Sequence, residues 1–220
     1  MKNSARFPHL LKSGVLHDLP RDFRTDFVDR CTVQFFEEPE VILTQGEPSP
    51  GMFLIAHGNI EIIYLGRDGQ RTFLARAAAG AIVGEAEAIA DQICAATCET
   101  TANTTLLFCP KPLLMESLSS VQFVKNLAAV FHGHLLQLNY FKLVDRYSPV
   151  DDRLCAYLLM FSERNTKIYD TQAYLASVVG CSRQTVNREL GKLRERKIID
   201  IRKGVIEILD REKLESFLKI

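Results

Sequence analysis

The 220-residue sequence predicts an α+β fold with an all-β amino-terminal part, one long helix, and a small carboxyl-terminal domain of helices and a β-hairpin. Short β-branched and aromatic runs separated by glycines fill residues 32–109, which is typical of a β-sandwich or barrel. Apolar residues recur at helical spacing over about residues 121–146, and two short helical stretches precede an alternating segment between residues 171 and 209. The three parts are predicted to occupy residues 1–119, 120–148 and 149–220.

The charge distribution gives a first indication of a partner. Net charge is zero, but residues 151–220 carry 14 Lys and Arg against 11 Asp and Glu, so this part is +3 and the remainder is −3. A basic carboxyl-terminal domain has the sign expected for a nucleic-acid binder. The chain starts without the apolar core of a secretory signal, and no apolar run approaches the roughly 20 residues of a membrane span. We therefore expect a cytoplasmic protein with no membrane partner.

Five runs in the all-β part predict strands: Val41–Leu43, Met52–Ile55, Ile60–Tyr64, Thr72–Leu74 and Thr105–Phe108. Glycines punctuate them at the positions expected for turns: Gly46, Gly51, Gly58, Gly66, Gly69 and Gly80.

The six cysteines predict packing rather than metal chemistry. They lie at positions 31, 94, 98, 109, 155 and 181 without a Cys-x-x-Cys pair, and a reducing cytosol keeps such thiols free, so we expect no zinc site. Cys94 and Cys98 lie four residues apart in a segment expected to be extended, where both thiols face one side but stand too far apart for a direct disulfide. Two small buried thiols are favoured over a redox pair.

A helix opened by Pro112 is predicted to break near Ser119 and Ser120, and a long helix then runs from about Val121 to Arg146. Its apolar seam has spacings of three and four residues and comprises Val124, Leu127, Phe131, His134, Leu138 and Phe141. Such a seam is typical of a two-stranded coiled coil, although the same stripe can instead pack on the chain's own β part, and both can hold in part. Tyr147, Ser148 and Pro149 end the helix and form a hinge.

The histidines of this helix do not form a metal site within one chain. His132 and His134 are two residues apart, so they point roughly 200° from one another around the helix. One of them alone can ligate haem iron, but a packed or solvated histidine is the favoured interpretation.

Residues 171–196 predict two short helices joined by a tight turn. Thr171 caps the first helix, which buries Leu175, Val178 and Val179 and ends at Gly180. Ser182 caps the second helix. Val186, Leu190 and Leu193 form the buried stripe of that helix.

The polar face of the second helix predicts a DNA-reading helix-turn-helix. Arg183, Gln184, Asn187 and Arg188 are displaced by roughly 120° from the buried stripe. Arginine matches the paired acceptors of guanine, and an amide can pair with adenine, so Arg183, Gln184 and Arg188 are the candidate base-reading residues. The alternative, a polar face that merely contacts water, is weakened by the paired helices and by the hairpin that follows them.

Two alternating segments, Ile198–Ile201 and Val205–Leu209, flank Arg202, Lys203 and Gly204 and predict a β-hairpin, the wing of a winged helix-turn-helix. Cations at its tip are suited to phosphate contacts that fix position without reading sequence. The candidate positioning residues are Thr171, Ser182, Thr185, Asn187, Lys192, Arg202 and Lys203.

The motif Val-Gly-Cys-Ser-Arg-Gln-Thr-Val-Asn-Arg at 179–188 resembles the recognition motif of the CRP/FNR family of bacterial transcription regulators, usually Ser-Arg-Glu-Thr-Val-x-Arg. The resemblance implies that Arg183 and Arg188 contact bases. Gln184 stands where the family most often has Glu, and an amide can also donate, so the preferred half-site is expected to differ at that base pair.

The segments 53–62 and 80–85 look like the cyclic-nucleotide-binding double-stranded β-helix, a jelly-roll-like β-roll, of the same family. The resemblance now covers nearly the whole chain. It implies a homodimer that is parallel along the long helix and reads a two-fold operator with half-sites roughly 34 Å apart. It also implies allosteric control by a signal sensed in the β-roll.

The effector is left open by the residues that should bind it. Cyclic-nucleotide binders of this fold place an Arg-Ser or Arg-Thr pair some ten residues after Gly84 and Glu85, where this chain has Cys94 to Thr97. A buried phosphate without a cationic partner is costly to desolvate, so cyclic AMP is not the expected effector. Small apolar walls suit an apolar or aromatic ligand, haem, or no ligand. The candidate pocket residues are Gly84, Glu85, Ala95, Ala96, Thr97 and Leu138.

The residues 1–30 hold no cysteine, which argues against the iron–sulfur cluster of oxygen-sensing family members. The expected function is that of a homodimeric DNA-binding transcription regulator with RNA polymerase as a further partner. An activator is the working interpretation, but the residues leave activation or repression open. The alternative is a haem- or redox-dependent sensor whose main chemistry is ligand binding. An enzyme is the least favoured class, because the sequence lacks Gly-x-Gly-x-x-Gly, Gly-x-Ser-x-Gly and His-Glu-x-x-His motifs.

Overall fold

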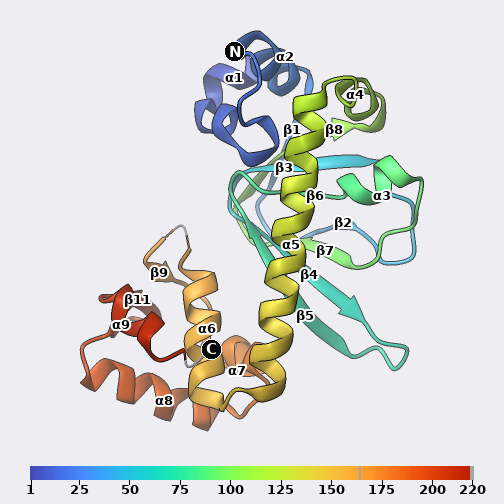
Figure 1. Cartoon of the computed structure of the whole chain (residues 1–220). Helices are drawn as coiled ribbons and strands as arrows, with labels where there is room; N and C mark the ends of the chain where they lie inside the picture. The colour runs from blue at the N-terminus through green and yellow to red at the C-terminus, as the bar shows by residue number, and fades with distance from the viewer. Residues whose placement is uncertain (164, 219–220) are drawn as a thin grey trace. The chain divides into compact units, whose positions relative to one another are not determined.

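The computed structural model of the chain describes residues 1–163 and 165–218 (Figure 1). Contacts divide the chain into two compact units, Met1–Leu136 and Gln137–Ile220, hereafter unit 1 and unit 2. The division falls inside the long helix α5 (Val121–Tyr147), so one part of this helix belongs to each unit.

Unit 1 holds two four-stranded antiparallel sheets, one in the order β1-β8-β3-β6 and the other in the order β2-β7-β4-β5. Every predicted strand is present, and the structure adds β1, β6 and β7, of which only the start of β7 lies in a segment expected to be extended. The strands are β1 (Thr32–Phe36), β2 (Val41–Leu43), β3 (Gly51–His57), β4 (Asn59–Leu65), β5 (Arg71–Ala78), β6 (Ile82–Val83), β7 (Thr97–Thr100) and β8 (Thr104–Pro110).

Strand β3 explains why the apolar run at 52–56 does not alternate with polar residues. Met52 and Leu54 belong to the core beneath the helices of unit 1, whereas Phe53 and Ile55 belong to a second core that also includes Ile60 of the other sheet. Both faces of β3 are therefore buried, and a strand covered on both faces reads as a continuous apolar run. This arrangement is the double-stranded β-roll expected from the sequence.

Helices cover one face of the β1-β8-β3-β6 sheet. These elements are α1 (Asn3–Arg6), the 3-10 helices η1 (Pro8–Lys12) and η2 (Gly14–Leu16), α2 (Arg21–Arg30), α4 (Lys111–Ser117) and the first part of α5, whereas α3 (Glu85–Ala90) follows β6. Phe123 and Leu127 of α5 are buried in this core, and the Asn126 amide donates hydrogen bonds to the carbonyl oxygens of Val15 and His17 at 3.0 and 2.7 Å. The beginning of α5 is therefore fixed to unit 1.

The helix boundaries around α5 lie where the sequence predicted them. Helix α4 ends at Ser117, α5 spans Val121–Tyr147, and α6 (Val150–Phe161) begins after Pro149. The hydroxyl of Ser120 accepts from the backbone N–H of Phe123 at 3.3 Å, which supports the start of α5.

Unit 2 combines helices with a three-stranded sheet in the order β10-β11-β9. The predicted hairpin is present as β10 and β11, and β9 adds a third strand that the sequence did not indicate. Besides α6, the elements are β9 (Lys167–Ile168), α7 (Gln172–Val179), α8 (Arg183–Glu195), β10 (Ile199–Arg202), β11 (Val205–Ile208) and α9 (Arg211–Ser216). The second part of α5 packs on α6, with the ring centroids of Phe141 and Tyr157 4.9 Å apart.

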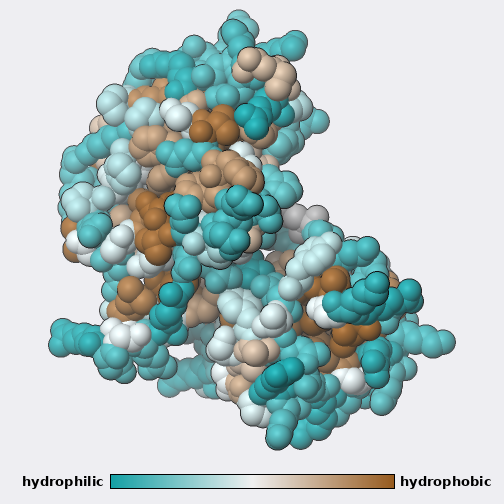
Figure 2. Space-filling view, turned by 180° about the vertical axis from the view of Figure 1, so that it is seen from behind, coloured by the Kyte–Doolittle hydropathy of each residue, from teal (hydrophilic) through white to brown (hydrophobic). Residues whose placement is uncertain are grey.

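The surface seen from behind is mainly hydrophilic, with apolar residues gathered in small patches (Figure 2). Exposed large apolar side chains on unit 1 include Phe35, Val41 and Ile93, which is ordinary for a folded surface. Within the described ranges, no helix combines the length and apolarity needed to cross a bilayer.

The turn between β3 and β4 gives a test of the roll. Gly58 has a φ of +81°, and a Cβ added there would lie 2.8 Å from the Cα of Thr104. We expect Gly58→Ala to lower the free energy of unfolding by about 2 to 4 kcal/mol, because left-handed strain and a backbone clash add.

The matched control is Gly69→Ala. Its φ is +78°, but none of the described atoms lies within 4 Å of the added Cβ, so strain alone should cost about 1 kcal/mol. Denaturant unfolding of both variants measures the difference, and equal losses would contradict the predicted clash.

Candidate DNA-binding surface and effector site

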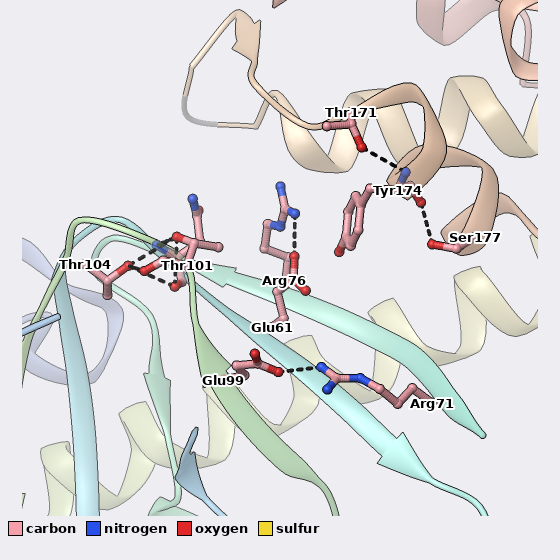
Figure 3. A network of polar contacts seen from close by, with 10 residues as sticks. Glu61, Arg71, Arg76, Glu99, Thr101, Thr104, Thr171, Tyr174 and Ser177 are labelled. Carbon is pink, nitrogen blue, oxygen red and sulfur yellow. Dashed lines mark hydrogen bonds and ion pairs between the residues drawn. The ribbon is translucent and has the colours of Figure 1, made fainter. Parts of the chain in front are cut away.

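Helix α7 begins and ends as the sequence predicted. The Thr171 hydroxyl accepts from the backbone N–H of Tyr174 at 3.1 Å, which caps the helix (Figure 3). Gly180 follows the last turn with a φ of +69°, the left-handed conformation that ends many helices. Leu175 and Val179 are buried and Val178 is half-buried, so this helix packs firmly inside unit 2.

Helix α8 divides into the two predicted faces. The Ser182 hydroxyl caps it by accepting from the backbone N–H of Thr185 at 3.1 Å. The stripe of Val186, Leu190 and Leu193 is buried. The polar residues Arg183, Gln184, Asn187 and Arg188 are all exposed. The structure thus brings the three candidate base-reading residues onto one open helical face.

Glu189 is a residue of this helix that the sequence analysis missed. Its carboxylate is only 7% exposed and accepts from Arg188 Nε at 2.9 Å and from Lys192 Nζ at 2.7 Å. These contacts, Lys192 first and Arg188 second, lower the pKa of Glu189 below its ordinary value, so it is ionised at neutral pH. The spacing of Glu189 and Lys192 on a helix was the available sequence signal.

The wing turns tightly at its predicted tip. Lys203 and Gly204 have φ values of +50° and +82°, which is the pattern of the two-residue type I′ hairpin. Both Arg202 and Lys203 are exposed, but Arg202 Nε donates to the Asp200 carboxylate at 2.6 Å. Part of the positive charge at the tip is therefore balanced within the wing itself.

A pocket of about 370 Å³ lies between helices of unit 2. Glu189 and Lys192 of α8 line it together with Asp152 of α6, Ser216 of α9 and the following Phe217. In the described part of the chain, no group of three or more His, Cys, Asp or Glu is arranged to hold a metal ion.

The expected effector site of unit 1 centres on a buried acid. Gly84 precedes α3, and Glu85, its first residue, is 3% exposed. The Glu85 Oε2 atom makes no hydrogen bond to the described residues. Burial raises the pKa of Glu85 to about 7, and the nearby Glu87 acts in the same direction. A buried acceptor without a partner is suited to a hydroxyl or amide donor and unsuited to a phosphate.

The remaining predicted pocket residues supply no cation. Ala95 is exposed and Ala96 half-buried, and the buried Thr97 hydroxyl accepts from the backbone N–H of Gln45 at 3.1 Å. Leu138 belongs to unit 2 and is exposed, so its place in an effector pocket stays a prediction. The polar pairs on the nearby strands, Glu61 with Arg76 and Glu99 with Arg71, are ion pairs within unit 1 (Figure 3).

The expectation that the segment from Cys94 to Cys98 is extended is wrong at its centre. Ala95 and Ala96 form a bend, and the strand β7 begins only at Thr97. Cys94 and Cys98 are both buried in the core between the sheets, and burial raises the pKa of both, that of Cys98 to about 12. Thiols held protonated are poor nucleophiles, so the structure favours a packing role.

The five histidines at positions 9, 17, 57, 132 and 134 are all exposed. Haem binds in enclosed pockets because both of its faces are apolar, and an exposed imidazole does not line such a pocket. These histidines therefore do not form an enclosed haem site within one chain.

The predicted seam of α5 needs a partial correction. Leu127 and Phe141 are 3% and 8% exposed because they pack inside unit 1 and unit 2 respectively, and Phe131 is half-buried. Val124, His134 and Leu138 are exposed. The exposed apolar surface of the helix includes residues outside the predicted seam, namely Val121, Leu135, Leu136 and Leu143. The predicted stripe therefore serves the chain's own cores in part, as the alternative interpretation held.

Two known domain families match the chain. The family described as the Crp-like helix-turn-helix domain matches residues 152–217, and the cyclic nucleotide-binding domain matches residues 33–120. Together the matches cover more than two thirds of the chain. Comparison with the sequences of curated proteins gives no match.

Solved structures share the fold over most of the chain. FixK2 from Bradyrhizobium japonicum is 19% identical with a TM-score of 0.74, covering 85% of this chain and 96% of that one. A CRP/FNR family transcriptional regulator from Thermus thermophilus is 22% identical with a TM-score of 0.67, covering 86% and 99%. CLP, a c-di-GMP-responsive global regulator from Xanthomonas campestris, is 17% identical with a TM-score of 0.64, covering 81% and 93%. At these identities the likeness shows the fold alone.

The buried acid predicts a pH dependence of stability. The pKa of Glu85 is higher in the folded chain than in the unfolded one, so the folded state holds its proton more tightly between pH 4.5 and about 7. Stability from this group is therefore lost as pH rises through that window, by about 3 kcal/mol in total.

Glu85→Gln removes this titration. We expect the free energy of unfolding of the variant, relative to wild type, to increase by about 2 to 3 kcal/mol between pH 5 and pH 8, measured by denaturant unfolding. A constant difference across this range would contradict a buried, unpaired Glu85.

Proposed function

Since the chain belongs to the CRP/FNR family of transcription regulators, we propose that it binds a two-fold DNA operator as a homodimer, through helix α8 of each copy. The observation that carries the proposal is the exposed polar face of α8, with Arg183, Gln184 and Arg188 opposite its buried stripe. A helix of this kind fits the major groove, and two copies related by a two-fold axis match a two-fold site.

The polar residues of the proposed DNA-binding surface divide into base-reading residues and phosphate-contacting residues. Arg183 and Arg188 would pair with guanine, and Gln184 would pair with adenine or tolerate more than one base. Backbone phosphates would be contacted from the wing and the helix starts by Thr171, Ser182, Thr185, Asn187, Lys192, Arg202 and Lys203. The Ser182 hydroxyl already caps α8 and lies 2.9 Å from the Thr185 hydroxyl, so both residues would contribute through the helix start rather than through free hydroxyls.

The exposed apolar face of α5 supports dimerisation. Val124, Leu135 and Leu138 are between 44% and 59% exposed on a single helix, and a second α5 would remove them from water. We further propose that the protein works in the cytoplasm and acts with RNA polymerase as an activator, as is expected of a regulator of this family.

A signal sensed in unit 1 would control the dimer by shifting a two-state equilibrium. The absence of a cation at Ala95 and Ala96, where a partner for the cyclic phosphate would be needed, argues against cyclic AMP as that signal. CLP, which shares the fold, responds to c-di-GMP, so the fold itself is compatible with effectors other than cyclic AMP.

Replacement of a base-reading residue should separate specific from general binding. On an operator selected from random DNA, Arg188→Ala should cost about 1 to 3 kcal/mol and flatten the sequence preference. Lys203→Ala, the control at the exposed tip of the wing, should weaken binding to all sequences alike. Fluorescence anisotropy on operator and random duplexes measures both, and equal losses for Arg188→Ala would count against base reading.

A charge placed on the exposed face of α5 should break the dimer. We expect Leu135→Glu to raise the dimer dissociation constant at least 100-fold, since a carboxylate would be buried against its symmetry mate. Ala129→Glu is the control, an exposed position roughly 120° away around the helix. Sedimentation velocity reports the state of each variant, and an unchanged Leu135→Glu dimer would exclude this face.

A further inference from the structure

Glu189 holds the two neighbouring cations of the recognition helix at once. One carboxylate oxygen accepts from Arg188 Nε at 2.9 Å and from Lys192 Nζ at 3.0 Å, and the other lies 2.7 Å from Lys192 Nζ. The carboxylate is 7% exposed, whereas Arg188 and Lys192 are 67% and 54% exposed. The acid is therefore an inner anchor from which both cations extend toward solvent.

The contact at Nε restricts how Arg188 can present its guanidinium. Nε donates to the Glu189 carboxylate, and among the described residues neither of the two Nη groups makes a hydrogen bond, so that end of the guanidinium is free for a ligand. That end is the one that can pair with two acceptors on a guanine edge. A side chain held in this geometry loses less rotamer entropy on binding than a free arginine does.

Arg183 provides the contrast on the same face. It is exposed, and among the residues that the structure describes it makes no ion pair. The side chain of Arg188 is thus held by an ion pair, whereas the side chain of Arg183 is free to change rotamer. We expect the base pair read by Arg188 to be discriminated more sharply than the one read by Arg183.

The same carboxylate also reduces the general attraction to DNA. Arg188, Glu189 and Lys192 together carry one net positive charge, whereas the two cations alone would carry two. Non-specific affinity follows the number of phosphates that cations neutralise, so an internal anion weakens binding to every sequence. It does so without removing the guanine-reading fork.

We propose that Glu189 is a positioning residue that sets DNA specificity, by aiming Arg188 at its base pair and by lowering non-specific attraction. This inference rests on the proposed DNA-binding function and deepens it. A purely structural role would instead stabilise α8 by an ion pair at three-residue spacing, which would affect binding to all DNA in the same direction.

The direct test is Glu189→Leu in the full-length protein. Leucine fills the buried position and leaves the two exposed cations in water, so the fold should be retained. Against wild type, we expect operator binding to weaken about 3- to 10-fold and random-duplex binding to tighten about 2- to 5-fold. The slope of log K against log salt on random DNA should steepen by about one. Loss of discrimination should be concentrated at the base pair read by Arg188.

Three further variants isolate the cause. Glu189→Gln keeps an acceptor for Nε but not the charge, so its ratio of operator to random affinity should lie between wild type and Glu189→Leu. Glu207→Gln removes one negative charge from the wing, where Glu207 lies 3.9 Å from Lys167, and should tighten both DNAs alike. In an Arg188→Ala background, Glu189→Leu should leave base discrimination unchanged.

The outcomes separate this inference from the proposed function. Suppose that the wild type prefers the operator to random DNA, but that Glu189→Leu leaves both affinities unchanged or weakens both equally. This result would overturn the role of Glu189 and leave the proposed function standing. The role of Glu189 would also be overturned if Glu207→Gln lowered the ratio of operator to random affinity as much as Glu189→Leu does, because net charge alone would then explain the effect. A wild type that does not discriminate between any sequences would contradict the proposed function and this inference with it.

Discussion

The burial of β3 on both of its faces is the constraint on which unit 1 depends. Phe53 and Ile55 require the second sheet as a cover, and Met52 and Leu54 require a layer of helices on the other side. Helix α5 supplies part of that layer through Phe123 and Leu127. Once those residues are buried, the helical period leaves Val124 and Leu135 exposed on the same helix. The surface proposed for a second copy is thus a consequence of how the roll closes its own core.

The same period divides α8 into a buried apolar stripe and an exposed polar face. Val186, Leu190 and Leu193 fix the helix within unit 2, so Arg183, Gln184 and Arg188 need no further support to stay exposed. Glu189 lies between the two faces, where its carboxylate is buried but its partners are not. In the role proposed for Glu189, this one buried carboxylate would both orient Arg188 and reduce the net positive charge of α8.

Sequence patterns predicted the helix caps, helix ends and strands that depend on residues close together in the chain. The caps at Thr171 and Ser182, the end at Gly180, most strands of the roll and the break before Val121 follow from spacing and residue type. Patterns did not reveal the helices before residue 31, the short strands β6 and β9, or the burial of Glu189, because these depend on distant partners. The predicted dimer seam of α5 was wrong in part for the same reason. The spacing of apolar residues does not show whether Leu127 packs in the core of its own chain or against a second chain. The bend at Ala95 and Ala96 lacks the Gly or Pro that signals a turn.

Selection of operators from a random DNA pool by the purified protein, with and without added cyclic AMP, tests directly whether α8 of two copies reads DNA. We expect enrichment of a two-fold site whose half-sites lie about one helical turn apart, and we expect cyclic AMP not to change the enrichment. Enrichment only with cyclic AMP would contradict the inference drawn from Ala95 and Ala96. Enrichment of no sequence in either case would contradict the assignment of α8 as a DNA-reading helix in the free protein.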